Sequence, residues 1–269
     1  MKNESSFYPG RVARVVVAII VGAFVLLPLA TTLEYTFRDN KTGGYTLAHW
    51  TNLFDPSRAN IYRPLMTGLT NSLMLMVTTV VIVLILITPT MIFINLKFPR
   101  LRRIFEFVTL LPITIPAIVL VVGLAPIYMV VGRTLGTSAW TLCFAYGVLV
   151  LPYSCRAIQA SIDAINISTL AEAARTLGAS WLNVILRALM PNLRTGLLSG
   201  SLISVAVVLG EYTIASLLNR QNLQTSLVVV NQTDAFIAVI VSLLALAFCF
   251  LLLIIIGRIG RVGTSKKEV

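Results

Sequence analysis

The chain has 269 residues, of which 57% are hydrophobic and 12% are charged. Because soluble domains carry about 25% charged residues, this composition excludes an ordinary soluble protein and indicates an integral membrane protein. The formal net charge of +11 is spread between apolar segments and forms no basic stripe, so we expect membrane lipid around the chain and no nucleic acid bound to it.

Six apolar segments are long enough to cross a bilayer, which requires about 20 mainly apolar residues. They cover residues 12–33, 69–96, 105–131, 140–158, 193–217 and 235–257. The first is too long for the apolar core of a signal peptide and no A-x-A site follows it, so we expect a retained span. Six prolines interrupt the segments and predict kinks: Pro28, Pro89, Pro112, Pro116, Pro126 and Pro152. The sequence predicts an all-α integral membrane protein, with residues 1–269 as a single transmembrane domain.

Lysine and arginine residues predict the orientation of these spans. If the amino terminus is cytoplasmic, fifteen of them lie on the inner side and six on the outer side. The cytoplasmic loops of membrane proteins carry the excess of Lys and Arg. We therefore expect both termini, and the loop of residues 159–192, to face the cytoplasm.

Residues 34–63 and 219–234 form the two longer loops on the expected outer side. In the first loop, Thr46 is placed to cap a helix that presents Leu47, Trp50 and Phe54. Two interpretations stay open for this helix. It is either an interfacial helix anchored by Trp50 or part of a surface on which an external protein lands.

The expected inner loop contains the stretch TLAEAARTLGASWLNVILRALMP, from Thr169 to Pro191. Thr169 and Glu172 have the spacing of a capping box, which predicts that a short helix starts at Thr169. Its apolar positions recur at helical spacing and predict one small, smooth face, made of Leu170, Ala173, Ala174 and Leu177. We expect this helix to be a docking site for another protein.

The residues that follow predict where this helix ends and how the chain continues. Gly178 is suited to the left-handed conformation that stops a helix, and Ser180 is suited to cap a second one. Apolar residues again recur at helical spacing in the second helix, at Trp181, Val184, Ile185 and Ala188. Pro191 then predicts a bend in the chain before the fifth apolar segment.

This stretch resembles the EAA loop of the six-span, binding-protein-dependent permeases of ABC importers. Matching residues stand at the family spacing, namely Glu172, Ala173, Ala174, Gly178 and Pro191. Ala188 stands where the family usually has Ile, and Met190 where it has Leu, and both keep apolar character. The resemblance implies a type I importer permease fold with six transmembrane helices and a cytoplasmic coupling helix. It assigns contact with the ATPase to the matching residues and to Leu177.

The same resemblance implies the partners and the location of the chain. We expect a cytoplasmic ABC ATPase dimer that carries ATP and Mg²⁺, so that no cofactor binds to this chain itself. A second permease subunit, a non-identical homologue, is expected to complete the path, and an extracytoplasmic binding protein to deliver the solute. The implied location is the bacterial inner membrane. The later spans look most like permeases for polyamines, while phosphonate, iron and oxyanion remain alternatives.

Glu211 is the one carboxylate deep within the fifth apolar segment. An ionisable residue there is costly and faces protein or a water-filled path. It either makes a packing hydrogen bond to a neighbouring helix or lies beside the translocation path, with Tyr212 and Thr213 as companions. A rival hypothesis is an ion-coupled secondary transporter in which Glu211 carries the proton or sodium ion. That hypothesis gives the EAA-like loop no purpose.

Other sequence features concern helix packing and the absence of catalytic and metal-binding motifs. Asn71 and Ser72 resemble a common feature of the family, and helix-end capping explains them equally well. Gly200 and Gly210 are suited to close helix packing. The sequence has no P-loop, HExxH or G-x-S-x-G motif, and its three cysteines and single histidine form no metal pattern. We therefore expect neither a disulfide, nor a metal site, nor an enzyme.

Overall fold

The computed structural model describes residues 10–40 and 42–262 of the chain. The helices, in chain order, are α1 (Arg11–Tyr35), α2 (Ala48–Asn52), η1 (Pro56–Arg58), α3 (Ala59–Ile82), η2 (Val83–Ile87), α4 (Thr88–Lys97), η3 (Pro99–Leu101), α5 (Arg102–Thr114), α6 (Ala117–Thr134), η4 (Ala139–Leu142), α7 (Cys143–Asp163), α8 (Ile167–Thr176), α9 (Trp181–Asn183), η5 (Val184–Leu189), α10 (Arg194–Gly210), α11 (Thr213–Leu217), α12 (Leu223–Asn231) and α13 (Ala235–Val262). An isolated bridge between Arg38 and Tyr45 is the one extended pairing within these ranges. The predicted all-α class is therefore confirmed.

The structure agrees with four of the predicted spans and divides the other two. Segments 12–33, 69–96, 140–158 and 235–257 each lie within one continuous helical stretch. Among the described residues, five helices are long and apolar enough to cross a membrane, and a sixth span exists if the bent pair Trp181–Leu189 and Arg194–Gly210 is counted as one. The second span begins at Pro56, earlier than the predicted residue 69. The prediction missed these first turns because their polar residues lower the local hydropathy.

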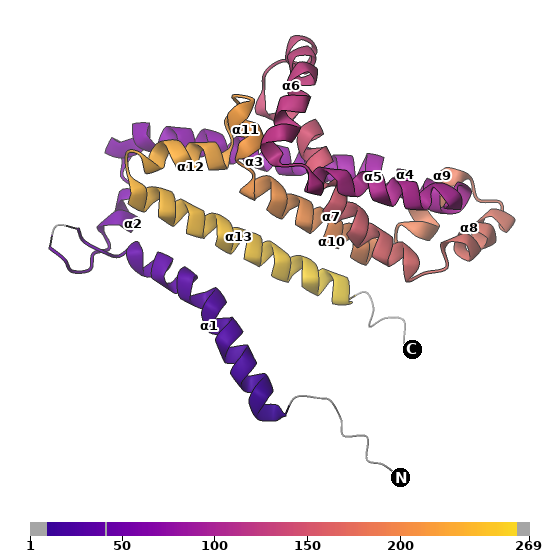
Figure 1. Cartoon of the computed structure of the whole chain (residues 1–269), viewed down its shortest axis with the longest axis horizontal. Coiled ribbons are helices and arrows are strands. Elements are labelled where there is room, and N and C mark those ends of the chain that lie inside the picture. The colour runs from indigo at the N-terminus through magenta and orange to yellow at the C-terminus, as the bar shows by residue number, and fades with distance from the viewer. Residues whose placement is uncertain (1–9, 41, 263–269) are drawn as a thin grey trace.

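The predicted third span, 105–131, is wrong as a single helix. It is divided into α5 and α6 at Ile115, which has the extended backbone angles φ −94° and ψ 124°. Pro116 explains this break, because a proline disfavours the helical conformation of the residue before it and donates no N–H. In Figure 1, α6 rises away from α5 and from the body of the molecule.

The predicted fifth span, 193–217, is also interrupted. Helix α10 ends at Gly210, and Glu211 follows with the extended angles φ −82° and ψ 123°. The chain then forms the short helix α11 and, after a left-handed Asn219, the helix α12. This interruption places Glu211 at a break between helices and not inside one.

Helices α7 and α10 form the centre of the body. A Cβ atom added at Gly196 of α10 would collide with the Ser161 side chain of α7, and one at Gly200 would lie 3.4 Å from the Ser154 carbonyl oxygen. Ser154 and Ser204 hydrogen-bond across the pair at 2.9 Å. Gly200 therefore permits close packing as predicted, whereas a Cβ at Gly210 would meet nothing within 4 Å.

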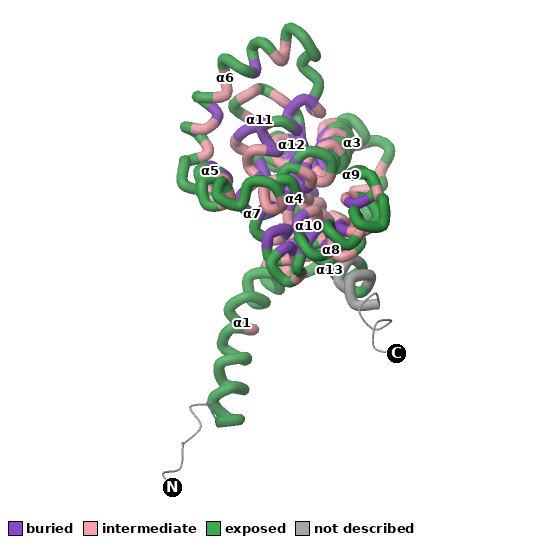
Figure 2. The backbone as a smooth tube through the Cα atoms, turned by 90° about the vertical axis from the view of Figure 1, so that its right-hand side faces the viewer, coloured by how far each residue is buried: buried purple, intermediate pink, exposed green. Residues whose placement is uncertain are grey.

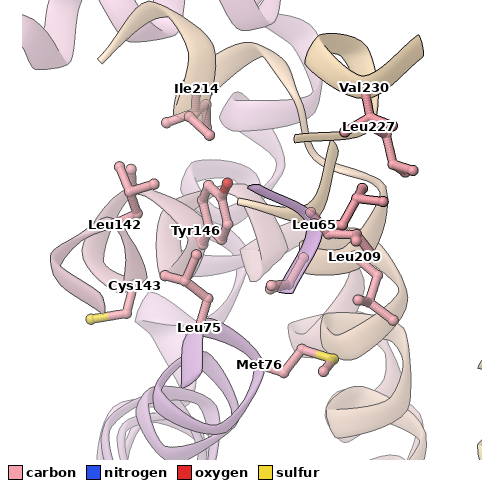
Figure 3. Packing of buried hydrophobic residues seen from close by; sticks show 14 of the residues in the cluster. Leu65, Leu75, Met76, Leu142, Cys143, Tyr146, Leu209, Ile214, Leu227 and Val230 are labelled. Carbon is pink, nitrogen blue, oxygen red and sulfur yellow. The ribbon is translucent and has the colours of Figure 1, made fainter. Parts of the chain in front are cut away.

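Buried apolar side chains gather in two clusters along this central pair. One cluster, shown in Figure 3, joins α3, α7, α10, α11 and α12 around Tyr146, Leu75 and Ile214. The other surrounds Ile158, Leu189 and Leu193 and extends to α8. The molecule thus has an α2 end, which carries α2 and the end of α12, and an α8 end, which carries α8 and α9, while α11 lies between them beside α6 (Figure 1).

Two helices have little contact with this core. Helix α1 has no buried residue among those described, and Tyr35 at its last turn stacks on Phe236 of α13 at 4.9 Å. From that point α1 leads away from the body, exposed along its length (Figure 2). Helix α6 buries Val121 and Tyr128 and leaves most of its other apolar side chains exposed.

Candidate functional site

The candidate coupling helix α8 begins earlier than the sequence predicts. It starts at Ile167, and its N-cap is Asn166, whose side-chain oxygen accepts a hydrogen bond from the Thr169 N–H at 3.2 Å. The predicted capping box between Thr169 and Glu172 is therefore wrong. Asn166 is a strong capping residue, and once it caps the helix, Thr169 lies inside the first turn.

The buried face of α8 differs from the predicted one. Ile167 and Ala171 are buried, and Leu170 and Ala174 pack partly buried beside them. These four residues have the i, i+3, i+4, i+7 spacing of one helical face. The predicted face that grouped Ala173 and Leu177 with them is therefore wrong. Ala173 and Glu172 are exposed, and the side chain of Leu177 is 88% exposed at the end of the helix.

The end of α8 confirms the predicted glycine stop. Gly178 has φ +82°, in the left-handed region that glycine adopts without steric cost. Its N–H donates to the Arg175 carbonyl at 2.9 Å, and the Ala179 N–H donates to the Ala174 carbonyl at 3.1 Å. These two bonds form a Schellman motif, which satisfies the last carbonyls of the helix and fixes its final turn.

The second half of the loop also follows its prediction. The Ser180 hydroxyl caps α9 by accepting a hydrogen bond from the Asn183 N–H at 3.4 Å. Val184 is buried, and Ile185 and Ala188 are half-buried. The chain turns around Pro191, so that Trp181–Leu189 and Arg194–Gly210 are bent by 84°.

Trp181 connects the loop to two other helices. Its ring lies 4.7 Å from the Lys97 ammonium nitrogen at the end of α4 and 5.3 Å from the Arg175 guanidinium carbon of α8. Arg175 also donates to the Ala179 carbonyl at 2.6 Å. A cation over an indole face is attracted by the ring, so these contacts hold the loop against α4. The sequence marked Trp181 only as an apolar position.

Glu211 lies in a buried hydrogen-bond network at the start of α11. One carboxylate oxygen accepts from the Ile214 N–H at 2.7 Å. The other accepts from the Tyr146 hydroxyl at 2.9 Å and from the Ala215 N–H at 3.3 Å. The residue is 8% exposed. This geometry matches the structural interpretation, in which the carboxylate bonds to a neighbouring helix, and it also caps α11.

Tyr212 and Thr213 differ from Glu211 in their surroundings. Tyr212 is 41% exposed and Thr213 is half-buried. They share the helix break with Glu211 but are more exposed than it. An apolar cavity of about 590 Å³ between α3 and α13 is walled by residues such as Leu65, Met76 and Phe248. It offers no charged group to a polar solute.

Asn71 and Ser72 connect α3 to the loop between α11 and α12. Asn71 donates to the Gln221 carbonyl at 2.8 Å, and the Ser72 hydroxyl accepts from the Leu223 N–H at 2.8 Å. They lie in the middle of α3, so helix-end capping does not explain them. Asn222 completes this junction by donating to the Glu211 carbonyl at 2.6 Å and to the Tyr146 hydroxyl at 3.1 Å.

Trp50 is held within the protein at the α2 end. Its indole N–H donates to the Thr36 hydroxyl at 3.1 Å, and its ring stacks on Phe37 at 6.0 Å. The Thr46 hydroxyl accepts from the Ala48 N–H at 3.1 Å, but the predicted cap at Thr46 is wrong, because Leu47 is the N-cap of α2 and no side chain caps this helix. Leu47, the N-cap residue of α2, is exposed.

The first longer loop contacts both the second longer loop and the start of α13 at the α2 end. Arg58 pairs with Asp234 at 3.4 Å, and the His49 ring stacks on Phe236 with centroids 3.7 Å apart. Hydrogen bonds from the side chain and backbone of Ser57 hold the pKa of Asp55 below its ordinary value. The surface of the α2 end therefore carries exposed apolar groups next to ionised ones.

The described residues contain no group of three or more His, Cys, Asp or Glu side chains placed to hold a metal ion. Cys143, Cys155 and Cys249 are free thiols.

Comparisons with known proteins agree with this geometry. Residues 91–262 match the family described as binding-protein-dependent transport system inner membrane component, and this match covers α8, the central pair and the Glu211 network. The chain is also similar to the spermidine/putrescine transport system permease protein PotC of Haemophilus influenzae, with 33% identity over 101 residues. That alignment spans 38% of this chain and 38% of PotC.

A match over more than half of the chain, together with helices suited to cross a membrane, assigns the protein to a family of membrane permeases and not of enzymes. The chain belongs to the inner-membrane components of binding-protein-dependent transport systems, the permeases of ABC importers.

Proposed function

We propose that this chain forms half of the translocation path of an ATP-driven importer, and that α8 docks on a separate ATPase subunit. The observation that carries this proposal is the geometry of α8. Its inner face is anchored by Ile167 and Ala171, while Ala173 and the almost fully exposed Leu177 point away from the body. A small apolar surface on a helix with a fixed end suits a groove in another protein. ATP and Mg²⁺ would bind to that ATPase.

The connections of α8 indicate how its movement would reach the path. It follows α7 after three residues, and it leads through α9 and η5 to α10. Since α7 and α10 pack closely, a displacement of α8 would move both as one unit. The network of Glu211 and Asn222 joins the end of α10 to α11 and α12. ATP binding to the ATPase docked at the α8 end would thus change the arrangement of helices at the α2 end, as alternating access requires.

A second permease subunit would complete the path, and we expect it to be a non-identical homologue. The apolar surfaces of α1 and α6 support this part of the proposal. Both helices leave most of their apolar side chains uncovered by this chain. In a membrane these surfaces would contact lipid or protein, and a helix that projects from its own subunit is suited to pack on another.

An external binding protein would land on the α2 end. This orientation places both termini in the cytoplasm, in keeping with the excess of Lys and Arg at the α8 end. The contact of Arg58 with Asp234 joins the two longer loops, and the contact of His49 with Phe236 joins the first loop to the start of α13. Tyr45, Leu47 and Phe54 are exposed on this surface. Exposed apolar groups rimmed by charges are typical of protein interaction sites.

We propose a polyamine as the solute, and the similarity to PotC, a permease named for spermidine and putrescine, supports this choice. Phosphonate, iron and oxyanion are the alternatives that an uptake assay separates. The ion-coupled hypothesis is less favoured. The Glu211 carboxylate already accepts three hydrogen bonds from the protein, so these contacts account for its presence without transport of an ion.

The test begins with purification of the chain from its native membrane in mild detergent and identification of its partners by mass spectrometry. We expect an ATPase and a second permease to co-purify. The complex is then reconstituted into liposomes with its binding protein, and uptake of radiolabelled spermidine is measured with and without internal ATP. Uptake that needs ATP supports the proposal. A chain that purifies alone, with uptake driven by an ion gradient, contradicts it.

A further inference from the structure

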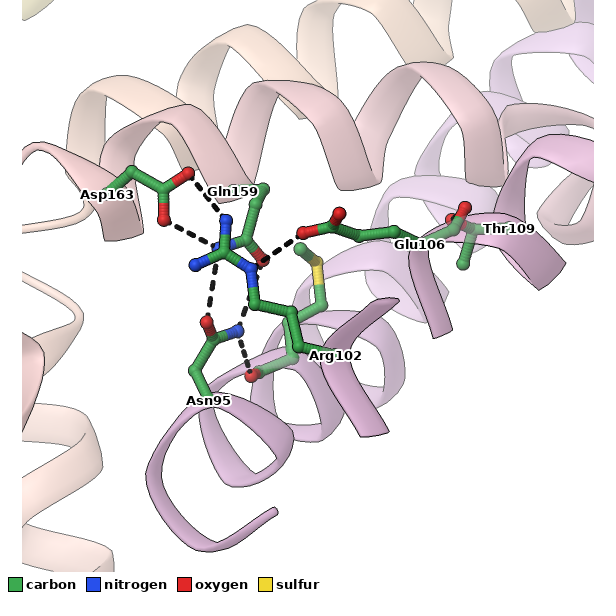
Figure 4. Close-up of polar contacts among 7 residues, drawn as sticks. Asn95, Arg102, Glu106, Thr109, Gln159 and Asp163 are labelled. Atoms are coloured by element: carbon green, nitrogen blue, oxygen red, sulfur yellow. Dashed lines mark hydrogen bonds and ion pairs between the residues drawn. The ribbon is translucent and has the colours of Figure 1, made fainter. Parts of the chain in front are cut away.

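A polar cluster joins three helices beside the coupling loop, defined as α8 and α9. We name it the Arg102 cluster, and its members are Asn95 of α4, Arg102 and Glu106 of α5, and Gln159 and Asp163 of α7 (Figure 4). The Arg102 guanidinium donates to Glu106 at 2.7 Å and to Asp163 at 2.8 Å. Gln159 donates to Asp163 at 3.0 Å and exchanges two 3.1 Å hydrogen bonds with Asn95.

The position of the cluster relates it to the coupling loop. Asp163 is the last residue of α7, and α8 begins four residues later. Arg102 is the first residue of α5, and Asn95 precedes Lys97, which contacts Trp181. The cluster therefore lies where the chain leaves α7 for the coupling loop. No sequence motif marked it, because its members lie on three separate segments.

Apolar packing between α5 and α7 is incomplete beside the cluster. A hollow of about 360 Å³ lies there, and its wall includes Phe105, Thr109 and Cys155. The side chains of Arg102, Glu106 and Asp163 are 37%, 44% and 46% exposed. Ion pairs this exposed contribute little to overall stability. A guanidinium held by two carboxylates nevertheless fixes the relative orientation of the helices that carry these groups, since its donors have a rigid planar geometry.

We propose that Arg102 is a positioning residue, which makes α5 move together with the coupling loop when the ATPase closes. This inference rests on the proposed function, and it adds α5 to the helices that receive the motion. Without Arg102, displacement of α8 reaches α7 and α10 through the chain, while α5 follows only through its incomplete packing. Arg102 acts through Asp163 and Gln159 and touches no solute.

The experiment measures whether α5 follows the loop. The three native cysteines are replaced by alanine, and spin labels are attached at Leu182 of α9 and Phe107 of α5, which are both exposed. The distance between the labels is measured in the complete complex with its ATPase, reconstituted in lipid, with and without ATP, Mg²⁺ and vanadate. In the parent protein we expect one distance, unchanged by nucleotide. In Arg102→Gln we expect a second distance that appears only with nucleotide and vanadate.

Two matched variants identify the cause. Arg103→Gln removes the same charge from the next position, where the side chain is exposed and makes no hydrogen bond or ion pair with any described residue. We expect it to behave like the parent. Arg102→Lys keeps the charge and should suppress the second distance in part. All variants are compared for retention of the ATPase and for thermal unfolding, which a positioning role leaves nearly unchanged.

The outcomes separate this inference from the proposed function. If Arg102→Gln and Arg103→Gln give the same single distance while the complex still hydrolyses ATP, the positioning role is overturned and the importer assignment stands. If the parent already shows two distances with nucleotide, α5 moves independently of the loop, and the inference is wrong. If no ATPase accompanies the chain, the proposed function fails and this inference fails with it.

Discussion

Substitution of Gly178 should destabilise α8 through backbone strain alone, without any steric clash of the new side chain. The Gly178 φ of +82° is left-handed, and a Cβ added there would meet no atom within 4 Å. Any destabilisation by a larger residue must therefore come from the backbone. A left-handed alanine costs roughly 1–2 kcal/mol relative to glycine. Asparagine tolerates this region better, and a β-branched valine tolerates it worst.

The predicted order of local destabilisation is therefore Gly178→Asn, then Gly178→Ala, then Gly178→Val. The strain acts on the Schellman bonds donated by Gly178 and Ala179, so it lowers the free energy of opening the last turn of α8. A loss of about 1–2 kcal/mol corresponds to roughly 5- to 30-fold faster amide exchange. Hydrogen exchange of the segment 174–184, followed by mass spectrometry in lipid nanodiscs, measures this change directly.

Gly123 provides the matched control. It is exposed in the middle of α6, and a Cβ there also meets nothing within 4 Å, but its φ is not in the left-handed region. Gly123→Ala should leave exchange of the segment 174–184 unchanged, since alanine is favoured over glycine in a helix. If Gly178→Val exchanges as slowly as the parent, the left-handed stop does not fix α8, and the reasoning is refuted.

Three further predictions concern other parts of the molecule. Glu172→Lys should weaken retention of the ATPase during purification without altering thermal unfolding, since Glu172 is exposed on α8; equal retention would argue against docking there. Tyr146→Phe should lower the free energy of unfolding by about 1–3 kcal/mol, because it removes a buried donor to Glu211, and an unchanged denaturation midpoint would contradict the network. Gly196→Ala should cost about 1–3 kcal/mol through overpacking on α7. Ser161→Gly in the same chain should restore little of the loss, because a Cβ at Gly196 would still lie 2.8 Å from the Ala157 carbonyl oxygen; full recovery would show that the Ser161 side chain alone is the cause.

The contacts at the α8 end position helices relative to one another. Trp181 attaches the loop to α4, and the Arg102 cluster attaches α5 to α7. These contacts are polar or partly exposed, whereas α7 and α10 are held by close packing. Different helices are therefore coupled to the loop by contacts of different kinds.

Local features of the chain were predictable from the sequence because they depend on neighbouring residues. Apolar length identified the membrane helices. The left-handed stop at Gly178 and the bend at Pro191 follow from the backbone properties of glycine and proline. The EAA-like spacing indicated the family that the match over residues 91–262 then assigned. The break at Pro116 also had a local signal, which the long apolar segment around it outweighed.

Only the tertiary structure decided which side chains meet. Tyr146 and Glu211 are 65 residues apart, Arg102 and Asp163 are 61 apart, and Ser72 and Leu223 are 151 apart. Periodicity predicts the face on which a residue lies, but it does not say which helix will cover that face. For this reason the sequence analysis did not identify Ile167 and Ala171 as the residues that anchor α8, and it placed Glu211 inside a helix that in fact ends at Gly210. Side-chain partners across helices depend on how the helices are arranged, and that arrangement has no counterpart in the linear pattern.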